Sequence, residues 1–332
     1  MQVRNQKVIK PPASPVSYHL LHRSQLARVE DLATKVRTRG RGVAAFAARR
    51  HIVLPYRGSF QWHVGGWDVV ADPTQVLFVE SGEEYHISHP VSGDASLVLW
   101  PEESMLDEMM HSRISGSSCA SQFQRRSRLA SFETKLLAHQ VRQAAWQGAD
   151  PLALDELTID LLGALTSDAN RCRTYQIAPH AKINLARVYL QQYHGDPISL
   201  SEVANAVGLS AVYLTQAFTR MVGTSMYRYL VRIRLAEALN RIPKCDDLTD
   251  LAMDLGFSSH SHFSATFRGA FGTSPSVIRN RFRKLPELAT SKKVASGTHP
   301  GFNPKPLELC VARSNMSDGI RWTPDDGSAP IF

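Results

Sequence analysis

The sequence predicts a multidomain α+β protein. A β-barrel domain with associated helices is followed by an all-α domain built from two helix-turn-helix units. Two observations predict this division. Between residues 43 and 100, short apolar or alternating segments are interrupted by turn-forming residues about every eight to twelve positions, which is typical of a barrel or sandwich. Further along, residues 200–210 (LSEVANAVGLS) recur with helical periodicity as residues 248–258 (LTDLAMDLGFS).

The 332-residue chain is long enough for two buried cores. We expect a disordered lead over residues 1–17, a barrel domain over 18–166, a linker over 167–180, a helical domain over 181–285 and a disordered tail over 286–332. The lead has no apolar core of a secretion signal, and no stretch approaches the roughly eighteen apolar residues of a membrane span. We therefore expect a soluble, cytoplasmic protein without a membrane partner.

Helical spacing follows the barrel segments of the N-terminal half. It covers residues 103–112, 128–147 and 151–166, and the third segment opens with a proline in its first turn. The apolar stripes of these helices can pack on the barrel or on a second subunit. A homodimer is therefore one expectation from this half of the chain.

Each copy of the repeat predicts one short helix followed by a tight turn. Apolar residues stand at the i, i+3, i+4 and i+7 positions of a buried helix face in both copies. Gly208 and Gly256 then supply the left-handed backbone that ends a helix, and Ser210 and Ser258 or Ser259 can cap the next one. In the first copy, Ser199 and Glu202 also fit a capping box.

A second helix follows each turn and presents a polar face to solvent. Leu214 and Phe218 in the first unit, and Phe263 and Phe267 in the second, lie four residues apart and point inward. The outward residues are then Val212, Thr215, Gln216 and Thr219 in the first helix and Ser261, His262, Ala265 and Arg268 in the second. Between the units, residues 226–242 predict a helix of about 25 Å that Pro243 stops.

Positive charge concentrates on the helical region. Residues 180–285 hold 13 Lys and Arg against 7 Asp and Glu, whereas residues 1–179 hold 20 against 18. A basic surplus beside short, nearly acid-free helix faces fits a phosphate-rich partner, since an α-helix enters the major groove of DNA. A solvated helical hairpin with a basic surface remains the alternative.

The stretch GFSSHSHFSATFRGAFGTSPS, residues 256–276, carries a family resemblance. Residues 180–285 resemble the DNA-binding domain of AraC-type (AraC/XylS) bacterial transcription regulators. The resemblance implies a sequence-specific regulator that binds double-stranded DNA in successive major grooves and contacts RNA polymerase. Residues 43–100 resemble, more weakly, the cupin-like barrel sensor of that family, which implies an unknown small-molecule effector and dimerisation by the following helices.

Alignment with the family assigns base reading to outward residues of both units. The positions carried over are Val212, Thr215, Gln216, Ser261, His262 and Ala265. Relatives often have arginine at positions 216 and 265, so the bidentate guanine contact is absent at both, although Gln216 can pair with adenine. Ala265 offers only apolar contact, and we expect phosphate contacts from Arg220, Arg268 and Arg279.

The chemistry of the N-terminal half leaves alternatives open. Aromatic residues can line an effector pocket or form ordinary barrel core, and they are Tyr56, Phe60, Trp62, Trp67 and Tyr85. The candidate effector-binding residues are Tyr56, Trp62, His63, Tyr85 and His86.

The histidines of this half also raise the question of a metal. His63, His86 and His89 with Glu80, Glu83 and Glu84 lack the usual ligand spacing. The four cysteines, Cys119, Cys172, Cys245 and Cys310, form no CxxC pair. We expect no metal, no cofactor and no catalytic residues.

Two rival functions remain. One is a metal-dependent barrel enzyme with an appended DNA-binding domain, and the other is a non-specific DNA binder. The sequence leaves open the effector, the operator, and whether regulation is positive or negative.

Overall fold

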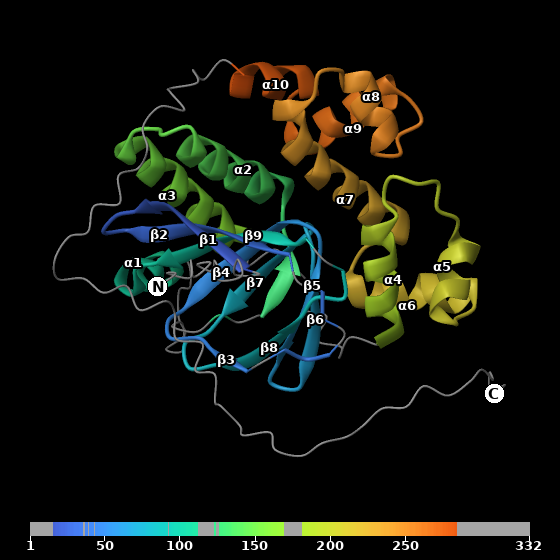
Figure 1. Cartoon of the computed structure of the whole chain (residues 1–332), viewed down its shortest axis with the longest axis horizontal. Coiled ribbons are helices and arrows are strands. Elements are labelled where there is room, and N and C mark those ends of the chain that lie inside the picture. Colours follow the sequence, from blue (N-terminus) through green and yellow to red (C-terminus); the bar gives the residue numbers. More distant parts are fainter. Residues whose placement is uncertain are drawn as a thin grey trace, which may run out of the picture.

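The computed structural model describes residues 16–35, 37–38, 40–42, 44–91, 93–111, 123, 126–168 and 181–283. These residues form two β-sheets covered on one side by helices, next to a bundle of further helices (Figure 1). The predicted α+β architecture is confirmed. The predicted lead, apart from residues 16–17, and the predicted tail lie outside the described residues.

The larger sheet, sheet A, is antiparallel with the strand order β1-β2-β9-β4-β7-β10. Its strands are β1 (Val16–Arg23), β2 (Ala27–Thr34), β9 (Ala95–Pro101), β4 (His51–Arg57), β7 (Gln75–Val79) and β10 (Ser127–Leu129). The smaller sheet, sheet B, is also antiparallel. Its strands are, in spatial order, β3 (Ala45–Phe46), β8 (Glu84–Ser88), β5 (Phe60–Val64) and β6 (Trp67–Ala71).

Side-chain alternation divides the N-terminal domain into two cores. On β4, Ile52 and Leu54 are buried toward the helices, whereas Val53 packs in the core shared with sheet B. The same alternation on β7 directs Phe78 to the helices and Leu77 to sheet B. Sheet A is therefore the middle of three layers, with sheet B on one side and α2 and α3 on the other (Figure 1).

The helices of this domain are α1 (Glu103–His111), α2 (Phe132–Trp146) and α3 (Pro151–Asp168). The helix predicted from residue 128 begins later, because residues 127–129 pair with β7 as strand β10. Ser131 then caps α2 by accepting a hydrogen bond from the Thr134 backbone N–H. Two further strands, β1 and β2, precede the region in which strands were expected.

The C-terminal domain is entirely helical within residues 181–283. Its helices are α4 (Ala181–Gln192), α5 (Leu200–Val207), α6 (Ala211–Val222), α7 (Met226–Arg241), the 3-10 turn η1 (Ile242–Lys244), α8 (Leu248–Asp254), α9 (His260–Phe271) and α10 (Pro275–Arg283). Helix α7 is the predicted rod. Tyr229 and Ile233 in its first half pack with the first unit, and Leu235 and Leu239 in its second half pack with the second.

The two domains pack against each other through polar and aromatic contacts. Asn184 of α4 donates to the Asp68 carbonyl (3.1 Å), and Gln147, which follows α2, donates to the Phe282 carbonyl (3.3 Å). The rings of Phe132 and Phe271 meet edge to face with centroids 5.4 Å apart. The N-terminal domain therefore touches both units of the helical domain.

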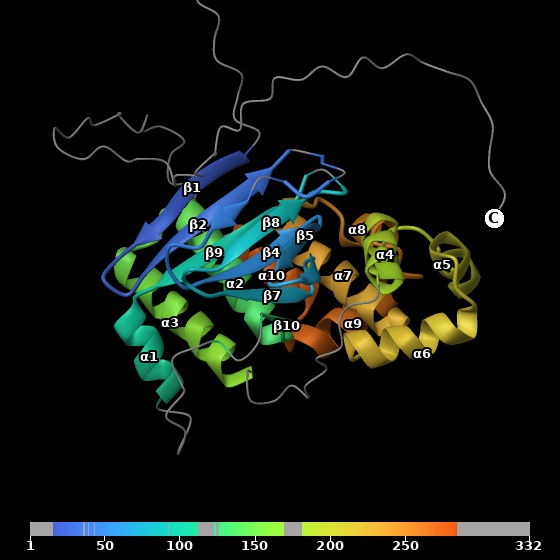
Figure 2. The ribbon, with the colours of Figure 1, turned by 90° about the horizontal axis from the view of Figure 1, so that it is seen from below.

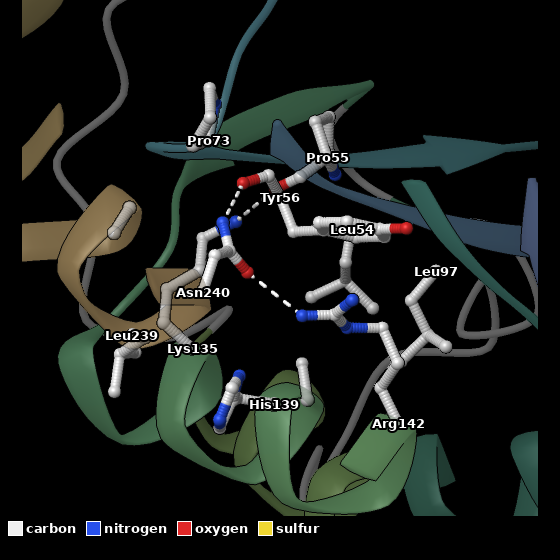
Figure 3. A pocket seen from close by; sticks show the side chains of 12 residues that line it. Leu54, Pro55, Tyr56, Pro73, Leu97, Lys135, His139, Arg142, Leu239 and Asn240 are labelled. Carbon is white, nitrogen blue, oxygen red and sulfur yellow. Dashed lines mark hydrogen bonds between the residues drawn. The ribbon is translucent and has the colours of Figure 1, made fainter. Parts of the chain in front are cut away.

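A small cavity of about 20 Å³ lies at the same interface. Figure 3 shows Arg142 of α2 and Asn240 of α7 pointing toward each other beside it, and the guanidinium donates to the amide oxygen at 2.8 Å. The Asn240 amide in turn donates to the Tyr56 carbonyl, while Arg142 lies 3.9 Å from the centroid of the Tyr56 ring. Residues of β4, α2 and α7 thus line much of the cavity.

Among the helices of the described residues, none combines the length and the apolar content that crossing a bilayer requires.

Candidate nucleic-acid interface

The first helix-turn-helix unit is α5, a turn and α6, and its predicted capping is confirmed. The Ser199 side chain accepts from the Glu202 backbone, while the Glu202 carboxylate accepts from the Ser199 backbone at 2.7 Å. Gly208 has a φ of +63°, a left-handed conformation that glycine adopts without a steric cost. Ser210 then caps α6 through the Tyr213 backbone N–H. These local interactions fix the turn between the helices.

Helix α6 buries one face and exposes the other, as its sequence predicts. Leu214 and Phe218 are fully buried against α4, α5 and α7. The outward residues Val212, Thr215, Gln216, Thr219 and Arg220 are exposed. The exposed residues form a face one helix wide that is free of carboxylates.

The second unit, α8, a turn and α9, follows the same plan. Gly256 has a φ of +77°, and Ser259 rather than Ser258 caps α9 through the His262 backbone N–H. The Ser258 hydroxyl instead lies 3.1 Å from Nδ1 of His262, whose ring stands edge-on to Phe257. The imidazole is thus held in one orientation at the exposed start of α9.

The exposed face of α9 contains the four predicted residues, Ser261, His262, Ala265 and Arg268. Phe263 and Phe267 on the opposite face are fully buried. In Figure 2, α6 and α9 both lie along the lower edge of the molecule, outside the two sheets. The N-terminal domain therefore leaves both outward faces uncovered.

A groove of about 620 Å³ runs beside α9. It contains the Arg268 side chain, the half-buried Arg279 and several serine hydroxyls from α9 and the start of α10. The Arg279 guanidinium donates to the Asp246 carbonyl at 3.1 Å, which holds it at the groove wall. Two cations and several hydroxyls suit phosphate oxygens.

One edge of this groove is acidic. The Asp247 carboxylate caps α8 by accepting from the Thr249 backbone N–H, and this backbone bond lowers the pKa of Asp247. The carboxylate is therefore ionised near neutral pH. A phosphate is expected nearer Arg268 than Asp247, because like charges repel.

The candidate effector-binding residues of the N-terminal domain do not converge. Trp62 and Tyr85 lie in the core between the sheets, whereas Tyr56 lies at the domain interface. His63 points from the opposite face of β5, where its ring bonds to Asp68 (2.5 Å) and Ser88 (2.8 Å). His86 pairs with His63 across the two strands. Of the other aromatic residues considered, Phe60 is core and Trp67 is exposed.

The candidate metal ligands mostly bond to other groups. His89 pairs with Asp94 (2.7 Å), Glu80 accepts from the Phe123 backbone, and Glu83 pairs with Arg126. Within the described residues, His, Cys, Asp and Glu form no group of three that could hold a metal ion.

Sequence reasoning missed a polar cluster on the inner face of sheet A. Glu30 is 7% exposed and accepts from Trp100 Nε1 (2.8 Å) and Arg28 Nε (2.9 Å). The indole stacks on the His51 ring with centroids 4.2 Å apart. Because Glu30 pairs with Val98 and Val98 with Val53, all these side chains face sheet B. Predicting β2 as a strand from the sequence would have revealed that these side chains share one face of the sheet.

A buried charged cluster at the domain interface was also missed. Asp72, at the β6–β7 turn, is fully buried and accepts from Arg187 of α4 (3.1 Å) and from the Tyr229 hydroxyl of α7. Arg187 Nη2 also donates to the Val70 carbonyl (2.7 Å), and its Nε donates to Tyr229 (2.8 Å). Burial lowers the pKa of Arg187, but Tyr229 and Asp72 outweigh that effect and raise it overall. Burial raises the pKa of Tyr229, which keeps its hydroxyl protonated.

Comparison with known proteins supports the C-terminal assignment. Residues 203–281 match the family described as "Helix-turn-helix domain". Over 100 residues the chain is 33% identical to "HTH-type transcriptional activator RhaS" of Escherichia fergusonii and of Escherichia coli K12. The aligned part is 30% of this chain, and the chain spans only 36% of the length of these relatives.

Among solved structures, this chain is similar to a transcriptional regulator of Chromobacterium violaceum with an AraC-type DNA-binding domain. The identity is 27% and the TM-score 0.30, over 31% of this chain and 94% of the other. ToxT from Vibrio cholerae is 9% identical with a TM-score of 0.33, over 79% of this chain and all of the other.

Proposed function

We propose that this chain is a sequence-specific, DNA-binding transcription regulator of the AraC type, because residues 203–281 match a helix-turn-helix family and the chain is similar over 100 residues to the transcriptional activator RhaS. One observation carries the proposal. The duplicated scaffold buries Leu214, Phe218, Phe263 and Phe267 and thereby exposes one short polar face in each unit. Such faces have the width and the donors that the major groove accepts.

The residues divide into base readers and phosphate binders. Gln216 reads adenine through its amide, and Ala265 contacts a thymine methyl. Val212, Thr215, Ser261 and His262 flank these two positions. Arg220, Arg268 and Arg279 neutralise phosphates, with Arg268 and Arg279 acting through the groove beside α9.

We further propose that a small molecule controls DNA binding from the N-terminal domain. The polar cluster around Glu30 supports this, because a buried carboxylate beside Trp100 and His51 combines an acceptor with aromatic surface. A ligand-induced rise in melting temperature that Glu30→Gln abolishes is the expected result, and an equal rise in the variant would contradict this site.

Dimerisation and contact with RNA polymerase complete the proposal, together with a cytoplasmic location. For the dimer, three exposed apolar side chains on α2 and α3 offer a surface. They are Trp146 (53% exposed), Leu152 (67%) and Ile159 (41%). Sedimentation of the full chain and of Leu152→Glu tests this surface, and a monomeric wild-type chain would contradict it.

Selection of bound DNA from a random library by the full chain tests the proposed function. A regulator enriches one sequence and binds it at least about a thousandfold more tightly than random DNA at physiological salt. Similar affinity for all sequences, with a steep salt dependence, identifies a non-specific binder instead. Stoichiometric transition metal in the purified chain, together with turnover of a small molecule, would favour the alternative of a metal-dependent barrel enzyme with an appended DNA-binding domain.

A further inference from the structure

Helix α7 contains a buried arginine that joins the two helix-turn-helix units. Arg234 is 8% exposed, and its guanidinium donates to three backbone carbonyls. Its Nε bonds to the His194 carbonyl (2.7 Å) and its Nη2 to the Asp196 carbonyl (3.2 Å), both in the turn from α4 to α5. Its Nη1 bonds to the Gly256 carbonyl (2.7 Å), in the turn from α8 to α9. One guanidinium thus bridges the turn that leads into the first unit and the turn inside the second unit.

The two bridged turns also touch each other directly. A Cβ atom on Gly195 would lie 2.7 Å from the Asp254 carbonyl oxygen, and one on Gly256 would lie 2.8 Å from the Gly195 carbonyl oxygen. Real Cβ atoms do not approach other atoms so closely. Glycine at both positions is therefore what permits the contact that Arg234 holds.

The chemistry of this bridge requires arginine. A guanidinium is planar, carries five donors in a fixed fork and stays charged when buried, so it can serve three carbonyls in different directions. Lysine places three donors on a single nitrogen at the end of a flexible stem. Exchange for lysine keeps the charge but cannot keep all three bonds.

We propose that Arg234 is a positioning residue that fixes the placement of α9 relative to α6, and so sets the distance between the two DNA segments that the protein reads. This inference rests on the proposed DNA-binding function. A change of one base pair between the segments moves the second by about 3.4 Å along the duplex and rotates it by about 35°. A rigid bridge between the units cannot follow that movement.

The test compares binding of the full chain to its selected site with binding to the same site carrying one base pair more or less between the two halves. The wild-type chain is expected to lose at least about tenfold in affinity with either change. Arg234→Lys is expected to lose less than about threefold, while its sequence preference within each half stays the same. A merely structural role would weaken binding to all these sites alike.

The matched control is Ile233→Val, a change in the fully buried neighbour of Arg234. It is expected to lower the melting temperature and to keep the spacing dependence of the wild-type chain. An unchanged spacing penalty in Arg234→Lys, or a reduced one in Ile233→Val, would overturn the inference.

A second variant serves if Arg234→Lys fails to fold. Gly195→Ala leaves Arg234 in place but forces the two turns apart, so it is expected to shift or relax the preferred spacing. An unaltered spacing profile in that variant would also overturn the inference. A wild-type chain that selects no DNA sequence would instead refute the proposed function on which the inference rests.

Discussion

The buried cluster of Asp72, Arg187 and Tyr229 predicts a large cost for removing its carboxylate. Asp72→Ala deletes the acceptor of Arg187, of the Tyr229 hydroxyl and of the Thr74 backbone and hydroxyl groups. Because Arg187 is 8% exposed, its charge remains buried without a counter-charge. Breaking one side of such a pair costs about 3–5 kcal/mol. For a chain of this size, that is a fall in melting temperature on the order of 10 °C.

A double-mutant cycle separates this electrostatic cost from lost packing. Arg187→Met alone leaves the Asp72 carboxylate buried, whereas the double variant removes both charges. The double variant is expected to be destabilised by at least about 2 kcal/mol less than the sum of the single variants. Tyr229→Phe, which removes one hydroxyl, is expected to cost about 1–3 kcal/mol.

The assay is denaturant unfolding of the full chain at neutral pH, with melting temperature as a second measure. Glu102→Ala is the matched control, because Glu102 pairs with Arg49 at 3.0 Å on the surface with both side chains about half exposed. It is expected to cost at most about 1 kcal/mol. Single-variant effects that add within about 0.5 kcal/mol in the double variant would refute a coupled buried pair.

Three further predictions concern the C-terminal units and the domain interface. Gln216→Ala should weaken binding by about 1–3 kcal/mol at particular base pairs only, and an equal loss on every sequence would remove Gln216 from base reading. Arg268→Ala should weaken binding to all sequences and reduce the salt slope by about one, so an unchanged slope in a salt titration contradicts its phosphate contact. Burial lowers the pKa of His139 to about 3. The unfolded chain therefore binds its proton first as pH falls below about 6.5, and about 2 kcal/mol of stability is lost between pH 7 and pH 5. His139→Leu should lose less, and equal acid sensitivity in both chains contradicts this.

The C-terminal domain could be predicted from the sequence because its signals are local. The bonds between Ser199 and Glu202 span three residues. Gly208 and Gly256 indicate a left-handed backbone at their own positions. The spacing of Phe263 and Phe267 likewise fixes which face of α9 is buried. None of these features depends on a partner distant in the sequence.

The N-terminal domain was harder to predict from the sequence. The side of the sheet on which a strand residue lies depends on a partner strand that is distant in the sequence. Strand β2 carries Glu30 and Asp31, so its sequence resembles an exposed polar segment, although both residues are buried. Glu30 accepts a hydrogen bond from Trp100 on β9, and Asp31 accepts hydrogen bonds from the Tyr56 hydroxyl (2.6 Å) and from Trp146 (3.0 Å). These partners lie 25 to 115 residues away. The same dependence explains why the sequence left open whether the aromatic residues line a pocket or form barrel core.

In the proposed regulator, the domain interface limits how the N-terminal domain can control DNA binding. The N-terminal domain contacts α4, which packs against the first unit, through Asn184 and Arg187, and it contacts α9 of the second unit through the pairing of Phe132 with Phe271. Both outward faces stay exposed (Figure 2). The N-terminal domain also bonds to the connecting helix α7, where Asn240 accepts from Arg142 and donates to the Tyr56 carbonyl. In the proposed regulator, an effector that displaces one unit against the other must supply enough differential binding energy to strain or break the bridge at Arg234. For the proposed regulator, the exposed outward faces favour control through the spacing of α6 and α9 over occlusion of either helix.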